Sequence, residues 1–160
     1  MIYVGCTGHQ NLSLATRRDV AAAIAAVFVA IDDEELVGLS SLAAGADQLF
    51  AFAVLAAGGR LMAVIPSQDY EQAFQSEEPR ATYLSLARLA TSQTTLPFPA
   101  PSEDAFLAAG YEVADRCDIL LAVWDGQGAA GKGGTADVVY YARAHGRDVR
   151  VIWPLGASRR

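Results

Sequence analysis

The chain has 160 residues, of which 52% are apolar and 19% are charged, and this composition excludes a disordered chain. The length suits one domain with a core of its own. The formal net charge of −6 leads us to expect no nucleic-acid partner, because affinity for a phosphate backbone comes mainly from clustered Lys and Arg. A small anionic ligand is still compatible with this charge, since backbone N–H groups and helix N-termini can hold one.

Short apolar runs alternate along the chain with segments of helical periodicity. The runs are near-continuous, as in strands that are buried on both faces. Strands are predicted at Ile2–Cys6, Leu36–Leu39, Leu61–Ile65, Ile119–Trp124 and Val149–Trp153, with a weaker one at Thr94–Leu96. Helices are predicted at Thr16–Asp32, Ala46–Ala57, Arg80–Leu89, Asp104–Arg116 and Ala136–His145.

This alternation predicts an α/β fold built from right-handed βαβ units. We expect a single Rossmann-like domain over residues 1–160, with a mostly parallel sheet and helices on both faces. The first strand should lie beside the Ile119–Trp124 strand, with the chain winding in opposite senses from that point. The proline-containing segment 92–103 is interpreted as a surface loop.

The sequence shows no membrane or secretory segment. Its longest apolar run, Val20–Ile31, has 12 residues, whereas a bilayer crossing takes roughly 20. Met1 leads into the first strand without a basic start or a cleavage site. Cys6 and Cys117 have no metal-ligand spacing and are interpreted as buried, inert thiols. We therefore expect a cytoplasmic protein with no membrane partner, no metal and no cofactor.

The first strand ends in Gly5-Cys6-Thr7-Gly8-His9, at the edge where open α/β sheets bind ligands. Glycines on both sides of Thr7 let bare backbone approach a phosphate or a ribose, although a plain turn explains them equally well. The spacing is not that of the dinucleotide fingerprint. His9 is a candidate anion donor, but a structural hydrogen bond is the favoured interpretation.

Two further strand ends carry candidate ligand residues. Small residues after the second strand, including Gly45, leave helix N–H groups uncovered, and Asp47 falls in the first helical turn, where the helix dipole favours any carboxylate. After the fourth main strand, five glycines occupy the nine positions 126–134. Thr135 is predicted to cap the next helix. The candidates in this second segment are Asp125, Gly126, Gly133, Gly134 and Thr135.

A phosphate-loop ATPase is disfavoured. Residues 126–132 match G-x-x-x-x-G-K, but Gly133 stands where Ser or Thr would hold magnesium. Glycosidic hydrolysis is a separate hypothesis, since carboxylates can stabilise an oxocarbenium-like state or activate water. Its candidate catalytic residues are Glu112 and Asp137, with Asp125 nearby, although a solvated helix face and a helix dipole explain the first two as well.

Taken together, these motifs resemble the SLOG superfamily of Rossmann-like domains, named for Smf/DprA and the Lonely Guy enzymes. The resemblance runs from Met1 to about Trp153. It rests on the G-x-T-G-H opening, the S-x-A-A-G-A-D segment, the Val64-Ile65-Pro66 strand end with Tyr70, Trp124-Asp125-Gly126 and Gly133-Gly134-Thr135-Ala136-Asp137.

The resemblance implies a nucleotide or nucleotide-derived ligand, bound after the first strand and at the Gly-Gly-Thr helix start, and a homo-oligomer. Some members resemble phosphoribohydrolases, which release a base from a nucleoside 5′-monophosphate, and others are ligand-sensing modules. Nucleotide binding or sensing is our leading hypothesis and the hydrolase is the alternative. A module that only binds a protein partner is the third.

Overall fold

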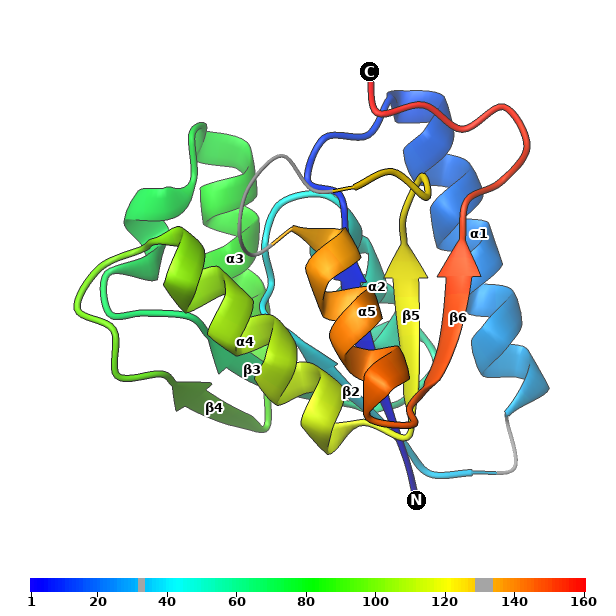
Figure 1. Cartoon of the computed structure of the whole chain (residues 1–160), viewed down its shortest axis with the longest axis horizontal. Helices are drawn as coiled ribbons and strands as arrows, with labels where there is room; N and C mark the ends of the chain where they lie inside the picture. The colour runs from blue at the N-terminus through cyan, green and yellow to red at the C-terminus, as the bar shows by residue number, and fades with distance from the viewer. Residues whose placement is uncertain (32–33, 129–133) are drawn as a thin grey trace.

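The computed structural model describes residues 1–31, 34–128 and 134–160 (Figure 1). Within these ranges six strands form one sheet in the order β4-β3-β2-β1-β5-β6, and all neighbours are parallel. The strands are β1 (Ile2–Gly8), β2 (Leu36–Ser40), β3 (Arg60–Ile65), β4 (Ser92–Thr95), β5 (Ile119–Val123) and β6 (Asp148–Ile152). The helices are α1 (Leu14–Ala30), α2 (Ala46–Ala56), α3 (Glu77–Leu89), α4 (Glu103–Arg116) and α5 (Thr135–Ala144), with a 3₁₀ turn, η1 (Tyr70–Ala73).

The predicted Rossmann-like α/β fold and the position of its winding reversal are confirmed. Residues Val4 to Gly8 of β1 pair in parallel with Ile119 to Val123 of β5, while β2 pairs with the other edge of β1. The chain therefore winds one way from β1 through β4 and the other way through β5 and β6. This arrangement brings the carboxyl ends of β1, β2 and β5 together at one edge.

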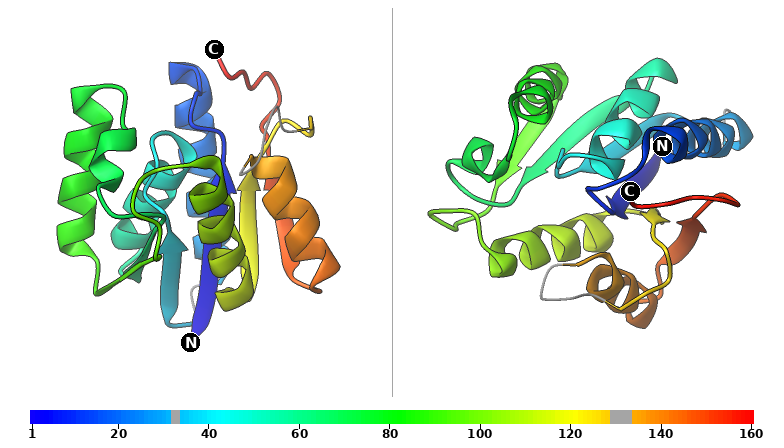
Figure 2. Two further views of the ribbon diagram at one scale, coloured as in Figure 1. Left: turned by 60° about the vertical axis from the view of Figure 1, so that its left-hand side comes forward. Right: turned by 90° about the horizontal axis from the view of Figure 1, so that it is seen from above.

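Helices cover both faces of the sheet, α1, α2 and α3 on one side and α4 and α5 on the other (Figure 2). On α1, Val20, Ile24 and Phe28 recur every fourth position and are buried against the sheet and α2. Each such side chain contributes roughly 1.5–3 kcal/mol on burial. On the opposite face, Val113 of α4 and Val138 of α5 pack over the centre of the sheet.

Several element boundaries differ from the prediction because caps and edge pairing decide them. The helix α1 begins at Leu14, since the Ser13 Oγ accepts the Thr16 N–H at 3.2 Å. The helix α3 begins at Glu77, with two glutamates in its first turn, where the helix dipole favours them. The weaker strand predicted at Thr94–Leu96 is present as β4, an exposed polar edge strand that begins at Ser92, within the segment 92–103 otherwise interpreted as a loop.

The two cysteines are buried, as predicted. Burial raises the pKa of the Cys117 thiol to about 11. Burial and the neighbouring Asp47 carboxyl raise the pKa of the Cys6 thiol well above its ordinary value. Both thiols are therefore protonated at neutral pH and poorly nucleophilic. In the part of the chain that the structure describes, no helix has the length and apolar character that a bilayer crossing requires.

The start of α2 lies directly against the loop that follows β1. Gly45, the N-cap of α2, has a φ of +81°, and a Cβ at this position would collide with the backbone carbonyl of Gln10. The next residue, Ala46, donates its N–H to the His9 carbonyl at 3.1 Å. Only glycine allows the two loops to approach this closely.

We predict that Gly45→Ala destabilises the protein more than Gly58→Ala does. Gly58 has a similar φ of +78° but open space around it, so its substitution costs only the left-handed strain of roughly 1–2 kcal/mol. The collision at Gly45 should add about 1–3 kcal/mol. Urea unfolding of both variants measures the difference, and equal losses would show that the contact between the loops is not tight.

Candidate functional site

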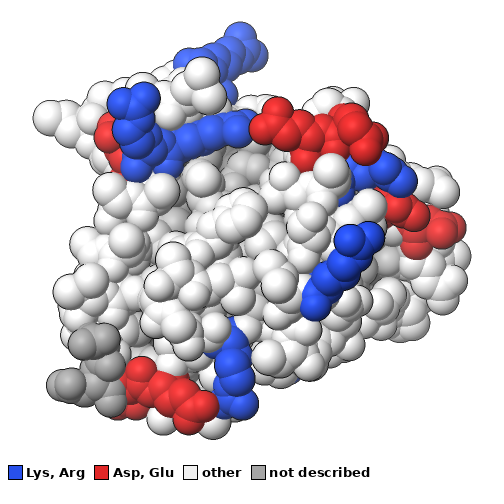
Figure 3. All heavy atoms as spheres, turned by 180° about the vertical axis from the view of Figure 1, so that it is seen from behind, with Lys and Arg blue, Asp and Glu red and all other residues white. Residues whose placement is uncertain are grey.

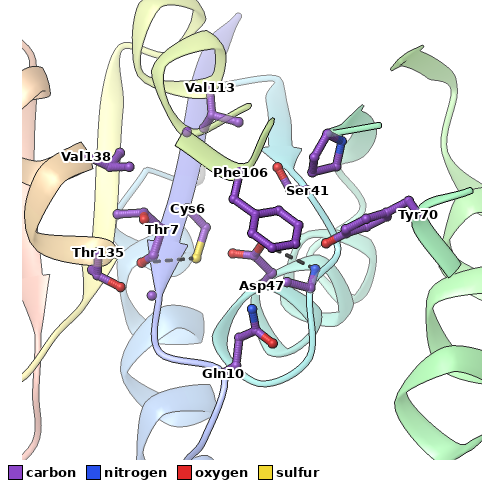
Figure 4. A pocket seen from close by; sticks show the side chains of 14 residues that line it. Cys6, Thr7, Gln10, Ser41, Asp47, Tyr70, Phe106, Val113, Thr135 and Val138 are labelled. Atoms are coloured by element: carbon purple, nitrogen blue, oxygen red, sulfur yellow. Dashed lines mark hydrogen bonds between the residues drawn. The ribbon is translucent and has the colours of Figure 1, made fainter. Parts of the chain in front are cut away.

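A pocket opens at the carboxyl ends of β1, β2 and β3, beside α4 and the start of α5 (Figure 4). It has about 530 Å³ of empty space, including its solvent-open mouth. The residues that line it come from five separate segments of the chain: Cys6, Thr7, Gly8 and Gln10; Ser41, Ala43 and Asp47; Pro66 and Tyr70; Phe106, Gly110 and Val113; and Thr135 and Val138. The winding reversal thus has a real cavity above it.

Asp47 is the ionisable side chain at the centre of this pocket (Figure 4). Its Oδ2 accepts the Ala43 N–H at 3.3 Å, and the residue is only 8% exposed. Burial raises the pKa of Asp47 to about 7, although hydrogen bonds from the Ala43 amide and the Cys6 thiol act in the opposite direction. The carboxyl can therefore donate or accept a proton near neutral pH.

Buried hydrogen bonds fix the loop before α2 and the first helical turn, which carries Asp47. The Ser40 hydroxyl accepts the Leu42 N–H at 3.0 Å and donates to the Asp47 carbonyl at 3.3 Å. Leu42 has a φ of +58°, a left-handed conformation that costs a residue with a Cβ roughly 1–2 kcal/mol. Gln48 donates to the carbonyls of Leu42 (3.2 Å) and Pro79 (2.9 Å). This network holds a strained loop in place beside the pocket.

One wall of the pocket is aromatic. The rings of Tyr70 and Phe106 lie 6.3 Å apart at an interplanar angle of 67°, and Tyr70 is buried against Phe74 and Tyr83. Rigid rings of this kind suit a flat, partly apolar group such as a nucleobase.

An anionic group in the pocket would depend on backbone amides. Among the described residues, neither Lys nor Arg lines it. Thr7, at the end of β1, and Thr135, at the start of α5, line the same pocket. Free N–H groups at the start of a helix such as α5 are a common phosphate site.

The predicted capping role of Thr135 is wrong. The N-cap of α5 is Gly134, which makes no side-chain capping hydrogen bond, and Thr135 is the first residue of the helix. Its side chain is buried in the pocket wall. Gly133 lies outside the residues that the structure describes.

The other predicted glycines lie in and around the strand ends. Gly8 lines the pocket, whereas Gly5 lies inside β1, where a Cβ would be 2.6 Å from the Val113 Cγ1 of α4. Gly45 faces the neighbouring loop, as described above. Gly126 is exposed after β5 with a φ of +84° and open space around it.

The two candidate catalytic carboxylates are not brought together in the pocket wall. On α4, Gly110 and Val113 line the pocket and Glu112 does not. On α5, Thr135 and Val138 line it, while Asp137 is half-buried next to them. Asp47 is the one carboxyl in the wall, among the residues described.

His9 and Asp125 form a cluster that ties strand ends together. The His9 Nε2 accepts the Asp125 backbone N–H at 3.0 Å, and its ring lies edge-on to Trp153 at 5.6 Å. Burial lowers the pKa of His9, and the charge of Arg159 lowers it further, so the ring is neutral at pH 7. Burial raises the pKa of Asp125, but the Gln127 N–H and the positive charge nearby outweigh burial and lower it. Neither residue lines the pocket.

Sequence reasoning missed the contribution of α4. Phe106, Gly110 and Val113 are spaced at helical intervals of four and three, so they share one face that lines the pocket. Their periodicity was visible in the sequence, but it is equally typical of a helix face that only packs on the sheet.

The fold and the pocket define a class of protein: a Rossmann-like domain with a pocket at its winding reversal. No protein-family model matches the sequence, and no curated protein does. Among solved structures, DNA processing protein A (DprA) from Streptococcus pneumoniae superposes with a TM-score of 0.69 at 22% sequence identity. The match covers 96% of this chain and 51% of that one, so this chain spans about half of that DprA.

Two further solved structures support the same fold. DprA from Helicobacter pylori has a TM-score of 0.69 at 16% identity, with 98% of this chain and 68% of that one covered. The molybdenum cofactor binding protein from Rippkaea orientalis has a TM-score of 0.58 at 13% identity, with 94% and 75% covered. This chain therefore shares its fold with DprA, one of the proteins after which the SLOG superfamily that the sequence motifs resemble is named.

The comparisons correct the expectation of no nucleic-acid partner. The H. pylori DprA, which has this fold, binds single-stranded DNA, so an acidic net charge on this chain does not exclude such a partner. Net charge averages over the whole surface, whereas phosphate contacts depend on local donors. In Figure 3, charged side chains of both signs stand in small groups toward the margins of one face, with uncharged surface between them.

We predict that Asp47→Asn stabilises the folded protein more at pH 8 than at pH 4. Above its ordinary pKa of 3.8, Asp47 ionises in the unfolded chain but stays protonated in the folded protein up to a pKa of about 7. The wild type should therefore lose stability relative to the variant as pH rises through this window, by roughly 1.4 kcal/mol per pH unit.

Urea unfolding of both proteins from pH 4 to pH 8 measures this trend. Asp19→Asn, on the exposed surface of α1, is the matched control and should follow the wild type. A constant difference between Asp47→Asn and wild type at every pH would contradict a proton retained at Asp47.

Proposed function

We propose that this protein binds or senses a nucleotide or a nucleotide-derived ligand in the Asp47 pocket. The observation that carries the proposal is the pocket itself, which joins two threonines, a buried carboxyl and an aromatic wall above the winding reversal. The R. orientalis protein with this fold binds a cofactor, and the H. pylori DprA binds single-stranded DNA, so related folds support recognition of both kinds.

In the proposed arrangement, each side of the pocket contacts a different part of the ligand. A phosphate would lie near Thr7 and Thr135, where hydroxyls and the N-terminal amides of α5 can donate to it. The flat part of the ligand would contact Phe106 and Tyr70. Asp47 would face a donor, such as a ribose hydroxyl or a base N–H, because a carboxylate beside a phosphate would repel it.

We predict that a nucleotide raises the stability of the protein and that Thr7→Val and Thr135→Val each weaken its binding. Ligand at 100 times its dissociation constant should stabilise the fold by about 2.7 kcal/mol. Loss of one hydroxyl that bonds a charged phosphate should weaken affinity by about tenfold. Thr94→Val on the exposed edge strand β4 is the matched control and should bind as the wild type does.

Thermal shift and calorimetry with a panel of nucleoside mono-, di- and triphosphates and a single-stranded oligonucleotide check this prediction. If no member of the panel shifts the melting temperature, the proposal fails. If the oligonucleotide alone binds, the ligand is a nucleic acid and the free-nucleotide assignment is wrong.

A phosphoribohydrolase is the second candidate function, and Asp47 is the observation that favours it. A buried carboxyl whose pKa is about 7, in the wall of a pocket, suits a general acid or base for the N-glycosidic bond. Water would add to the anomeric carbon as the bond to the base breaks, and the base would leave with a proton.

If the protein is a hydrolase, we predict that nucleoside 5′-monophosphates yield free base and ribose 5-phosphate, and that Asp47→Asn lowers kcat by roughly 10²–10⁴-fold. Chromatography of the products measures the rate. Glu112→Gln and Asp137→Asn test the two carboxylates proposed from the sequence. Absence of free base from every monophosphate would remove the hydrolase and leave the binding proposal standing.

A further inference from the structure

A second hollow adjoins the Asp47 pocket and has a different chemistry. It lies between the loop after β1, the start of α2 and the start of α3, with about 980 Å³ of empty space including its open side. The polar side chains that give it its character are Gln10, Asn11, Gln75, Ser76 and Thr82, and Arg17 and the carboxylate of Glu78 also line it. We call it the amide hollow, because amides and hydroxyls dominate its lining.

The two cavities meet at Gln10, which lines both of them. The loop between β2 and α2 also faces both, since Ala43 lines the Asp47 pocket while Ala44 and Gly45 line the amide hollow. Figure 4 shows the Gln10 side chain next to Asp47. The two cavities are therefore neighbours, with the loop after β1 and the loop before α2 between them.

The walls of the amide hollow are held by the same network that fixes Asp47. Gln48, which is buried and lines the hollow, donates to the Leu42 and Pro79 carbonyls and so joins the loop before α2 to the start of α3. The position of the amide hollow is thus fixed with respect to the Asp47 pocket. Two hollows with a fixed separation favour a ligand of fixed length.

The lining of the amide hollow suits a chemical group that is rich in nitrogen and oxygen atoms, such as a base or a sugar. Amides both donate and accept, so Asn11 and Gln75 can bond the edge of a base or the hydroxyls of a sugar. Arg17 donates its Nε to the Leu12 carbonyl at 3.3 Å and, within the described ranges, makes no ion pair. A phosphate that links two units would find this guanidinium on the rim.

We infer that the ligand consists of two linked nucleoside-type units, one in the Asp47 pocket and the other in the amide hollow, with the phosphate linker beside Gln10 and Arg17. This inference rests on the proposed function and extends it from ligand class to ligand size. A mononucleotide would fill only the first cavity and leave the amides of the second bonded to water.

The test compares AMP with two probes of two units, ADP-ribose and the linear dinucleotide pApA, by calorimetry. Because a second unit adds several hydrogen bonds, at least one of the two longer probes should bind about tenfold or more tightly than AMP. The double variant Gln75→Ala, Thr82→Ala should weaken that longer probe by about tenfold and leave AMP unchanged. Gln72→Ala, exposed on η1 outside both cavities, is the matched control and should bind as the wild type does.

The outcomes separate the two ideas. Equal affinity for AMP and both longer probes, or an equal loss of AMP and longer-probe binding in the double variant, would overturn the two-unit ligand while leaving nucleotide binding intact. If neither AMP nor a longer probe binds, the proposed function fails and this inference fails with it. Thermal unfolding of the double variant must match the wild type, which separates lost binding from lost folding.

Discussion

The parallel pairing of β1 with both β2 and β5 is the constraint on which the rest of this structure depends. Because the chain winds away from β1 in two directions, the connections after β1 and β2 and the start of α5 emerge at one edge without a helix to fill the space between them. The close approach at Gly45 then brings the first two of these connections into contact. The pocket is a consequence of topology, and its chemistry depends on a few side chains.

Asp47 gives that pocket its electrostatic character. A carboxyl in a poorly solvated site is costly to ionise, and a strained loop with buried hydrogen bonds keeps it there. The site therefore combines two kinds of group. The Asp47 carboxyl can accept hydrogen bonds from a donor, and the threonine hydroxyls and the N-terminal amides of α5 can donate hydrogen bonds to an anion. Such a division matches a ligand that carries both, as nucleotides do, and it needs no cationic side chain among the described residues of the wall.

His9 and Asp125 have a structural role at the strand ends, in contrast to Asp47. His9, Asp125 and Trp153 join the carboxyl ends of β1, β5 and β6, while the C-terminal tail folds back on α1, where the Ser158 N–H donates to the Thr16 Oγ1 at 2.8 Å. Rigid strand ends hold the loops of the pocket in register. Polar residues at the carboxyl edge of the sheet thus divide into those that face the cavity and those that hold the strand ends together.

The sequence by itself determined the α/β class, the strands, the reversal between β1 and β5 and the burial of both cysteines, because apolar runs and helical periodicity are local properties of the chain. Only the tertiary structure decided which side chains of α4 and α5 face the cavity, since that depends on how the helices rotate on the sheet and on each other, as at Gly110 against Val138. It placed Thr135 and Phe106 in the wall and left Glu112 outside it. It also gave Asp47 its perturbed pKa, because the free energy of a charge depends on what surrounds it in space.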